Sequence, residues 1–375
     1  MIFLIDGHSI AFRAFYALPE TLETKDGFPT NVIHGFLMML SKLVNNYDVE
    51  KIIITWDVSK KTFRNEIYED YKANRSSSPD NFKIQINKLQ SLLTKFNLPQ
   101  VSLEGFEADD VLGSLSKHFN KKNKKVTIVT GDRDSFQLIS SKTHIMYTKR
   151  GISDVEIFDS NVFTEKYQIN TNQYIEYLAL KGDKSDNIPG LPGVGEKTAI
   201  SLLLKYKKIS NIYKNLDELT PKLKSNFEEH KDLLNMSKDL ATIKTDLDLE
   251  IPTTNLSETI FLDNKVLEDS GNEISKYELN RFLGERTNLN KNENEKEKLE
   301  IKLLDKNIDV LSIVFNFENK NYFVNNDEFG EFESLLNFNN IISLSSRKLF
   351  NEFQIEKTDK FIAYYCMLFL LYPSI

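Results

Sequence analysis

Nine acidic residues in five short strings are the part of this sequence best suited to chemistry. The strings are LIDGHS, TWD, FEADDVL, TGDRD and KGDKSDNIPG, and they contain Asp6, Asp57, Glu107, Asp109, Asp110, Asp132, Asp134, Asp183 and Asp186. Carboxylate oxygens are the natural ligands of Mg²⁺ and Mn²⁺, and two such ions about 4 Å apart can activate water and neutralise charge on a phosphate. The strings therefore predict a two-metal site suited to phosphodiester hydrolysis.

Each of these acids also has an ordinary structural interpretation. Asp6 before Gly7 is typical of a turn, and the acids at 107–110 open a predicted helix, where the helix dipole stabilises each by about 0.3–1 kcal/mol. Taken one at a time, the structural interpretation is favoured. Taken together, unpaired acids at one edge of a sheet cost stability unless cations bind, so the joint pattern favours metal ions.

The elements that must position these acids alternate between strand and helix. Apolar runs at 2–5, 51–56 and 126–130 predict buried strands, and each is followed by an aspartate. Helical spacing of apolar residues appears at 32–44 and 108–119. Buried strands separated by helices indicate an α/β fold with a parallel sheet covered on both faces. In such sheets the working site lies beyond the carboxyl ends of the strands.

Composition narrows the class of protein. Cys366 is the single cysteine, which excludes an intrachain disulfide and a cysteine-rich zinc site, and the five histidines form no zinc pattern. The longest uncharged apolar stretch, 361–372, is too short to span a bilayer, and the N-terminus is unlike a signal peptide, so we expect no membrane partner. The net charge is −7, and without the nine site carboxylates it becomes +2, so net charge does not exclude a nucleic-acid partner.

A glycine hairpin runs into a predicted helix at Ile188–Ala199. Gly193 and Gly195 allow the backbone to approach a phosphate, and the N–H groups near Lys197 and Thr198 point toward it. Such contacts bind a DNA backbone without reading its sequence. A Gly-x-Gly pair alone is weak, but the full PGLPGVG string directly after an acidic GDKSD string is far more specific.

Basic and aromatic residues interleave in the two strings KKTFR (60–64) and YKANR (71–75). They suit phosphates and an unstacked base, but Glu66, Glu69 and Asp70 intervene, so a solvated helix face explains the spacing equally well.

In type, order and spacing, these motifs resemble the 5′-nuclease domain of bacterial DNA polymerase I, within the flap endonuclease family, over residues 2–250. Trp56 stands where that family usually has phenylalanine. The resemblance implies that all nine acids bind two Mg²⁺ or Mn²⁺ ions, directly or through water. It places Lys72 on the scissile phosphate and Arg75 beside it at the base of a helical arch, and makes Asp110 and Asp132 essential for cleavage.

The resemblance also implies the DNA contacts and the domains. The implied DNA contacts are Arg13, Arg64, Tyr71, Lys72, Arg75, Gly193, Gly195, Lys197 and Thr198, with K⁺ as a candidate ion at the hairpin. The expected architecture is a PIN-like or resolvase-like nuclease core at 1–180, with an arch at about 60–100, then a helix-hairpin-helix subdomain at 181–255. A connecting helix and polar linker would follow at 256–300, and a degenerate 3′→5′ exonuclease-like segment at 301–375. Ala363 stands where that segment's helix should carry an aspartate, so proofreading activity is not expected.

The expected function is a structure-specific 5′→3′ exonuclease and flap endonuclease, acting as a monomer in the bacterial cytoplasm at the nucleoid. Its partners would be 5′-flapped, nicked or 5′-ended duplex DNA, with an RNA–DNA hybrid as a further candidate, during primer removal and excision repair. A PIN-type single-strand ribonuclease and a non-catalytic DNA-binding module are the alternatives. The hairpin and arch strings argue against the first, and the presence of all nine carboxylates argues against the second.

Overall fold

The computed structural model describes residues 1–150, 154–256, 277, 302–303, 313–317 and 320–324. The chain divides into two compact units, Met1–Thr287 and Asn288–Ile375. In the described part of the chain, no helix combines the length and the apolar content that crossing a bilayer requires.

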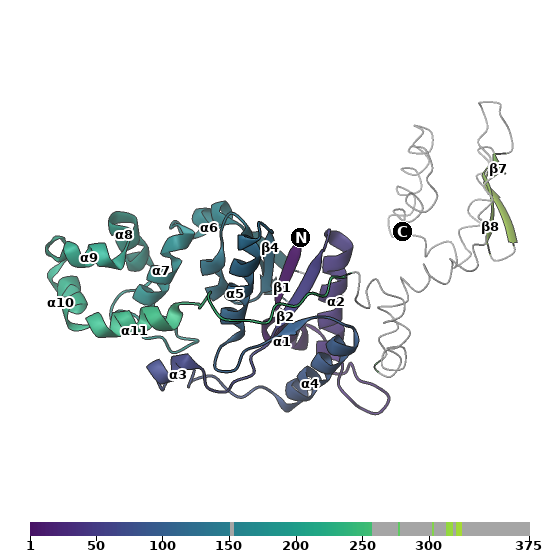
Figure 1. Cartoon of the computed structure of the whole chain (residues 1–375), viewed down its shortest axis with the longest axis horizontal. Helices are drawn as coiled ribbons and strands as arrows, with labels where there is room; N and C mark the ends of the chain where they lie inside the picture. The colour runs from purple at the N-terminus through teal and green to yellow at the C-terminus, as the bar shows by residue number, and fades with distance from the viewer. Residues whose placement is uncertain (151–153, 257–276, 278–301, 304–312, 318–319, 325–375) are drawn as a thin grey trace. The chain divides into compact units, whose positions relative to one another are not determined.

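A six-stranded sheet in the order β3-β2-β1-β4-β5-β6 forms the centre of the first unit (Figure 1). Its strands are β1 Ile2–Asp6, β2 Lys51–Thr55, β3 Gln100–Val101, β4 Val126–Thr130, β5 Thr143–Arg150 and β6 Asp154–Phe158. All neighbouring pairs are parallel except β5 and β6. The predicted strands are therefore confirmed, and the strand order changes direction between β1 and β4, where open parallel sheets place their ligands.

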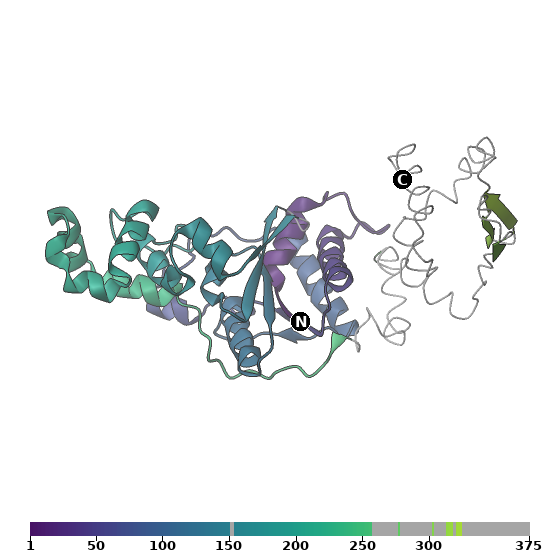
Figure 2. The ribbon, with the colours of Figure 1, turned by 90° about the horizontal axis from the view of Figure 1, so that it is seen from above.

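Helices cover both faces of this sheet, as Figure 2 shows. Phe3 and Ile5 belong to the hydrophobic cluster formed with α1 Gly7–Ala17, α2 Asn31–Asn46 and α4 Asp80–Lys95. Ile2 and Leu4 point to the opposite cluster, which includes α5 Ala108–Lys121. The alternation follows from the two-residue period of a strand. The helices predicted at 32–44 and 108–119 are confirmed as α2 and α5.

A helical region extends the second cluster away from the sheet (Figure 1). Its elements are α6 Ser160–Tyr167, η2 Thr171–Gln173, α7 Tyr174–Lys181, α8 Glu196–Tyr206, α9 Ile209–Lys214, η3 Leu216–Glu218, α10 Pro221–Glu229 and α11 Lys231–Ala241. The buried residues Leu203, Phe227 and Leu240 join the same hydrophobic cluster as Leu112 of α5. The helices and the sheet are therefore packed as one unit.

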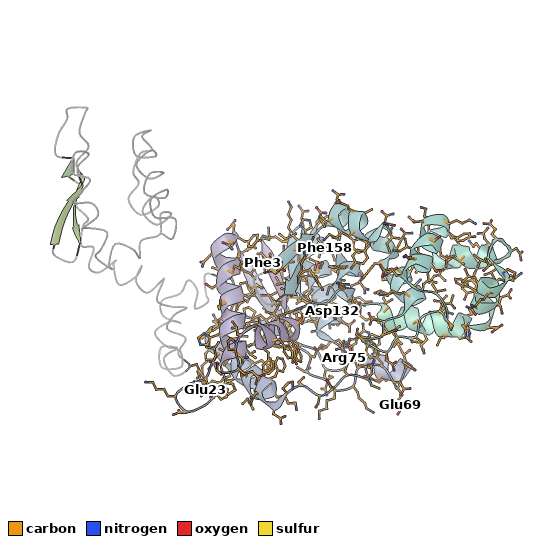
Figure 3. The ribbon with its side chains drawn as sticks, turned by 180° about the vertical axis from the view of Figure 1, so that it is seen from behind. Phe3, Glu23, Glu69, Arg75, Asp132 and Phe158 are labelled. Carbon is orange, nitrogen blue, oxygen red and sulfur yellow. The ribbon has the colours of Figure 1, made fainter. Side chains whose placement is uncertain are left out.

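The arch expected at about 60–100 occupies a shorter part of that segment than predicted. It contains the one-turn helix α3 Phe63–Ile67, and a series of turns follows to residue 74. In Figure 3, Glu69 of this segment lies at the edge of the unit, while Arg75 lies closer to Asp132. Helix α4, which the prediction included in the arch, buries Phe82 and Leu89 against the core instead. An amphipathic helix with a buried face is part of the core layer.

In the second unit, the described residues form a three-stranded antiparallel sheet of β7 Lys302–Leu303, β8 Ile313–Phe317 and β9 Lys320–Val324. These strands lie within the segment expected at 301–375. Ala363, and the helix expected to carry it, lie outside the described residues.

Candidate active site

The candidate site begins where β1 and β4 end side by side. Asp6, the last residue of β1, caps helix α1 by accepting the Ser9 N–H at 3.0 Å, and it accepts the Thr130 hydroxyl of β4 at 2.8 Å. Asp132 follows β4 in a tight turn, with its Oδ1 accepting the Asp134 N–H at 2.9 Å. These local bonds fix the carboxylates at the carboxyl edge of the sheet.

A pocket of about 250 Å³ opens at this edge. It is lined by Gly131, Asp132, Arg133, Asp134, Tyr147, Asp183, Ser185 and Asp186. The last three residues come from a loop that Asp183 and Ile188 close by exchanging N–H···O bonds of 2.9 and 2.7 Å. Gly182 before the loop has φ +72°, and a Cβ there would lie 2.5 Å from the Ile188 carbonyl oxygen. This position therefore requires glycine, which explains part of the KGDKSDNIPG string.

The carboxylates at this edge lack sufficient counter-charge. Burial, followed by repulsion from Asp57, raises the pKa of Asp6 to about 7. Burial and then the Asp132 carboxylate raise the pKa of both Asp109 and Asp134 well above the ordinary value. Burial also raises the pKa of Asp132. Clustered acids that resist ionisation are stabilised by bound cations, which is the chemistry expected of a metal site.

The described residues include no three acid or histidine side chains that are already gathered closely enough to hold a metal ion. Bringing ionised carboxylates closer costs free energy, and a divalent cation offsets that cost. The donor set, which is rich in carboxylate oxygens and poor in nitrogen and sulfur, fits Mg²⁺ or Mn²⁺.

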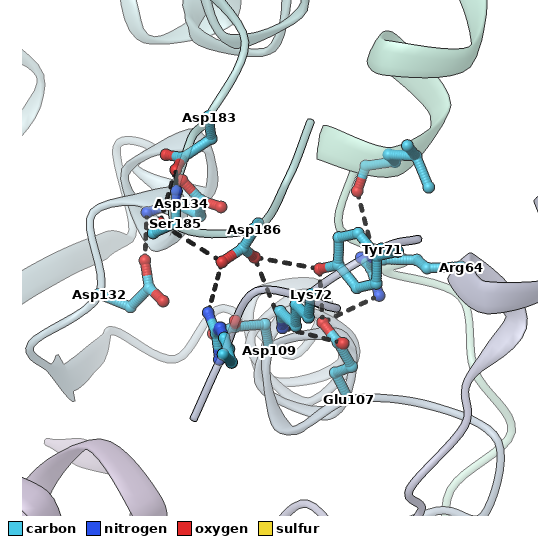
Figure 4. A network of polar contacts seen from close by, with 12 residues as sticks. Arg64, Tyr71, Lys72, Glu107, Asp109, Asp132, Asp134, Asp183, Ser185 and Asp186 are labelled. Atoms are coloured by element: carbon cyan, nitrogen blue, oxygen red, sulfur yellow. Dashed lines mark hydrogen bonds and ion pairs between the residues drawn. The ribbon is translucent and has the colours of Figure 1, made fainter. Parts of the chain in front are cut away.

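Two cations and a tyrosine from 71–75 contact the acids: Tyr71 and Lys72, which Figure 4 labels, and Arg75. The Lys72 ammonium lies 2.9 Å from Glu107 and 3.5 Å from Asp186, and Arg75 donates to Asp186. The Tyr71 hydroxyl lies 3.2 Å from Glu107 and 3.1 Å from Asp186. Burial acts to raise the pKa of Asp186, but Lys72 and Arg75 outweigh it and hold that pKa below the ordinary value.

The backbone of Lys72 is itself unusual. Its φ is +57°, a left-handed conformation uncommon for lysine, and its N–H donates to the Asp186 carbonyl at 3.0 Å. Strained backbone of this kind is often found at functional sites. Here it attaches the 71–75 turn to the loop that carries Asp183 and Asp186.

Asp110 is placed differently from the prediction. It is fully buried, and Arg64 donates to its two oxygens at 2.7 and 2.9 Å. Its oxygens also accept the N–H groups of Glu107 and Lys244. Because this carboxylate is already saturated by protein donors, the geometry gives it a structural position and not the metal-ligand role that the sequence suggested.

Arg64 and Tyr71 also differ from their predicted role as DNA contacts. Arg64 is 2% exposed, and it donates to the carbonyls of Leu240 and Thr242 besides its pairing with Asp110. Tyr71 is 5% exposed. Neither side chain is exposed enough to contact a DNA strand. Both therefore stabilise the site from inside the fold.

The remaining predicted residues lie on the surface near this edge or on the helical region. Asp57 is exposed, and it accepts the N–H of Ala108 at the start of α5 at 2.8 Å. Arg13 is half-buried and donates to the Lys149 and Gly131 carbonyls. At the hairpin, Gly193, Gly195 and Lys197 are exposed, and Thr198 is half-buried in the first turn of α8.

Sequence reasoning missed several residues that the structure brings to this edge. Arg133 and Tyr147 line the pocket, and His8 lies 3.5 Å from the Asp57 carboxylate. Arg133 had a local signal, since it stands between two predicted ligands in TGDRD. Tyr147 lies on a later strand and had none, because its position depends on the pairing of β5 with β4.

A parallel sheet with acids at its carboxyl edge, joined to a bundle of short helices, is the architecture of a 5′-3′ exonuclease, and residues 1–261 of this chain belong to that family. Residues 1–168 match the model of the 5′-3′ exonuclease N-terminal resolvase-like domain, and residues 169–261 match the 5′-3′ exonuclease C-terminal SAM fold. The predicted nuclease-core fold with a helical subdomain is thereby confirmed.

Individual relatives agree with this assignment. The chain is 40% identical to DNA polymerase I of Bacillus subtilis over 254 residues, which is 68% of this chain and 29% of that protein. It is 38% identical to DNA polymerase I of Mycobacterium tuberculosis over 262 residues, covering 70% of this chain and 28% of the relative. The chain thus spans less than a third of the length of these curated relatives.

The solved structures support the fold. The T5 D15 protein co-crystallised with metal ions matches with a TM-score of 0.55 at 20% identity, over 74% of this chain and 98% of that one. A T5 D15 flap endonuclease variant in a complex with DNA and metal ions matches with a TM-score of 0.54 at 20% identity, over the same shares.

Proposed function

We propose that this chain is a divalent-metal-dependent 5′-nuclease that hydrolyses DNA phosphodiesters near 5′ ends and flaps. The observation that carries the proposal is that under-neutralised carboxylates around Asp132 lie next to two cations, Lys72 (Figure 4) and Arg75, which both pair with Asp186. A phosphodiester placed between them would be held by cations on one side and by acid-bound metal ions on the other.

The proposed ligands of two Mg²⁺ or Mn²⁺ ions are the predicted carboxylates without Asp110, namely Asp6, Asp57, Glu107, Asp109, Asp132, Asp134, Asp183 and Asp186. When bound, the ions supply a water of lowered pKa and neutralise charge on the phosphate. Asp110 is omitted because Arg64 occupies both of its oxygens.

The chain's own cations change partners in this mechanism. Lys72 and Arg75 neutralise Glu107 and Asp186 before substrate binds. With metal ions held by those carboxylates, Lys72 and Arg75 would be free to contact the phosphate, where they would stabilise the charge that develops as the bond breaks. Their preformed position limits the side-chain entropy lost on binding.

The hairpin before α8 is proposed to hold the duplex. A Cβ at Gly195 would meet nothing within 4 Å, and the residue's φ is −97°, so neither space nor conformation requires glycine there. A small residue at an exposed helix N-terminus suits close approach of a phosphate, with Lys197 and Thr198 in the first turn. We extend the proposal to K⁺ at the hairpin carbonyls.

The proposed substrates are 5′-flapped, nicked and 5′-ended duplexes, and an RNA–DNA hybrid, bound by a monomer at the bacterial nucleoid in the cytoplasm. This assignment is supported by the relatives, which are bacterial DNA polymerases I, and by the DNA complex of the T5 structure. Primer removal and excision repair are the processes that present such ends.

A labelled 5′-flap duplex tests the proposal directly. Cleavage in Mg²⁺ and none in EDTA is expected, with blunt and nicked duplexes as comparison substrates. A PIN-type ribonuclease would instead degrade labelled single-stranded RNA in preference to the flap. Tight binding of the flap without cleavage in either Mg²⁺ or Mn²⁺ would favour a non-catalytic binding module.

A further inference from the structure

Arg133 is the one cation among the residues that line the carboxylate pocket. Although four aspartates line the same pocket, its guanidinium forms no ion pair with any residue that the structure describes. Its Nε donates to the Tyr147 hydroxyl at 3.3 Å, and its central carbon lies 5.8 Å from the tyrosine ring centroid. The two terminal nitrogens have no bond in the described part of the chain, so they remain available at the pocket rim.

The tyrosine that contacts Arg133 is itself held by aromatic packing. Tyr147 on β5 packs against Phe136 and Phe158, with ring centroids 5.5 and 6.1 Å away. Phe136 is almost fully buried and belongs to the main hydrophobic cluster. A side chain fixed by a packed tyrosine loses less rotamer entropy when it binds a ligand than a free surface arginine does.

The position of Arg133 complements that of Lys72 and Arg75. Those two pair with Asp186, whereas Arg133 follows Asp132 in the chain and lines the pocket beside Tyr147. Cations from two separate segments of the chain therefore reach the acids. An unpaired guanidinium next to carboxylates that take metal ions suits an anion with two oxygens in one plane, because its fork of donors matches a phosphate.

We propose that Arg133, held by Tyr147, binds the non-bridging oxygens of the backbone phosphate that neighbours the scissile one. This inference rests on the proposed nuclease function and adds a substrate-binding residue to it. It gives the enzyme a contact with the DNA strand that is separate from those of Lys72 and Arg75. The contact aligns the scissile linkage in the pocket and reads no base.

The experiment uses flap duplexes in which one linkage at a time is a neutral methylphosphonate, bound by the full chain in EDTA. Arg133→Ala is expected to weaken binding of the unmodified flap about tenfold and to lower the salt slope by about 1. With a methylphosphonate next to the scissile linkage, the wild-type protein and Arg133→Ala are expected to bind equally. Arg133→Lys is expected to recover part of the affinity, and Tyr147→Phe to lose a smaller part.

Lys184→Ala is the matched control, because Lys184, like Arg133, is an exposed cation that stands between two site aspartates, but it does not line the pocket. It is expected to bind like the wild type. Comparing 5′-phosphate and 5′-hydroxyl ends separates an internal phosphate from a terminal one, and a difference confined to the terminal phosphate would overturn the inference. Wild-type affinity in Arg133→Ala would also overturn it, while failure of the wild-type chain to cleave the flap would refute the nuclease function itself.

Discussion

In the carboxylate pocket most of the working side chains are buried or half-buried and depend on one another, whereas the hairpin before α8 exposes most of its working groups. Lys72 donates a hydrogen bond to Glu107 and forms an ion pair with Asp186, so a change in one of the three alters the electrostatic environment of the others. Gly193, Gly195 and Lys197 have no such mutual contacts among the described residues, and they act through backbone and charge. Chemistry needs a coupled, charged interior, while sequence-independent DNA binding needs only an accessible surface.

The largest effect is expected from Asp132→Asn. Loss of this charge should lower the single-turnover cleavage rate by on the order of 10³-fold, because the pocket would hold its metal ions poorly. Flap binding in EDTA should not weaken, since the hairpin is unchanged. The Asn side chain can still accept the Asp134 N–H, so the turn is preserved. Asp154→Asn, at an exposed position on β6, is the control and should cleave normally.

Asp109 and Asp110 provide a sharper form of the same comparison, since they are adjacent and have opposite environments. Asp110→Asn removes the closest counter-charge of the buried Arg64 and leaves it only the longer ion pair with Glu107 at 3.4 Å, so it should lower the free energy of unfolding by about 3–5 kcal/mol. Asp109→Asn removes a carboxylate whose pKa is raised well above its ordinary value, so it should stabilise the metal-free protein at pH 8. Urea unfolding in EDTA measures both, and equal shifts of the same sign would contradict the distinction.

Variants of Lys72 and Lys197 test kinetically whether cleavage and duplex binding are separate functions of the two regions. Lys72→Ala should lower the single-turnover rate by about 100-fold with little change in Kd, because a cation on the reacting phosphate acts mainly in the transition state. Lys197→Ala should raise Kd only a few-fold, lower the salt slope by about 1 and leave the rate at saturating protein unchanged. The same kinetic pattern in both variants would show that the two regions are not separated in function.

The frame of the site was predictable because it depends on local periodicity. The strands at 2–5, 51–56 and 126–130 are short apolar runs, and parallel strands bring the acids that follow them to one edge. The loop at 183–186 was identified only by its motif. Its closeness to β4 depends on the packing of α7, which no local sequence pattern shows.

The roles of Arg64, Tyr71 and Asp110 were not predictable from residue type. The basic and aromatic residues in KKTFR and YKANR suited DNA and a solvated helix face equally well, and only the carbonyls at the C-terminal end of α11 show that Arg64 is a buried support. One local signal did exist. Successive residues on a helix point about 100° apart, so Asp109 and Asp110 could not both face the pocket.

The smallest effect concerns pH and metal ions. Asp6 has a folded-state pKa of about 7, and those of Asp109, Asp132 and Asp134 are also raised, so the folded state keeps protons that the unfolded state releases above pH 4. Stability in EDTA should therefore fall as pH rises from 5 to 8. Asp186 acts in the opposite direction, because its lowered pKa contributes stability that is lost only in acid.

Mg²⁺ in large excess over its Kd should raise Tm at pH 8 by roughly 5 °C, and by less at pH 5, because it neutralises the carboxylates that have lost their protons at pH 8. Asp6→Asn should reduce the dependence of Tm on pH in EDTA. Identical Tm values at pH 5 and 8 in EDTA would show that these acids do not destabilise the metal-free protein.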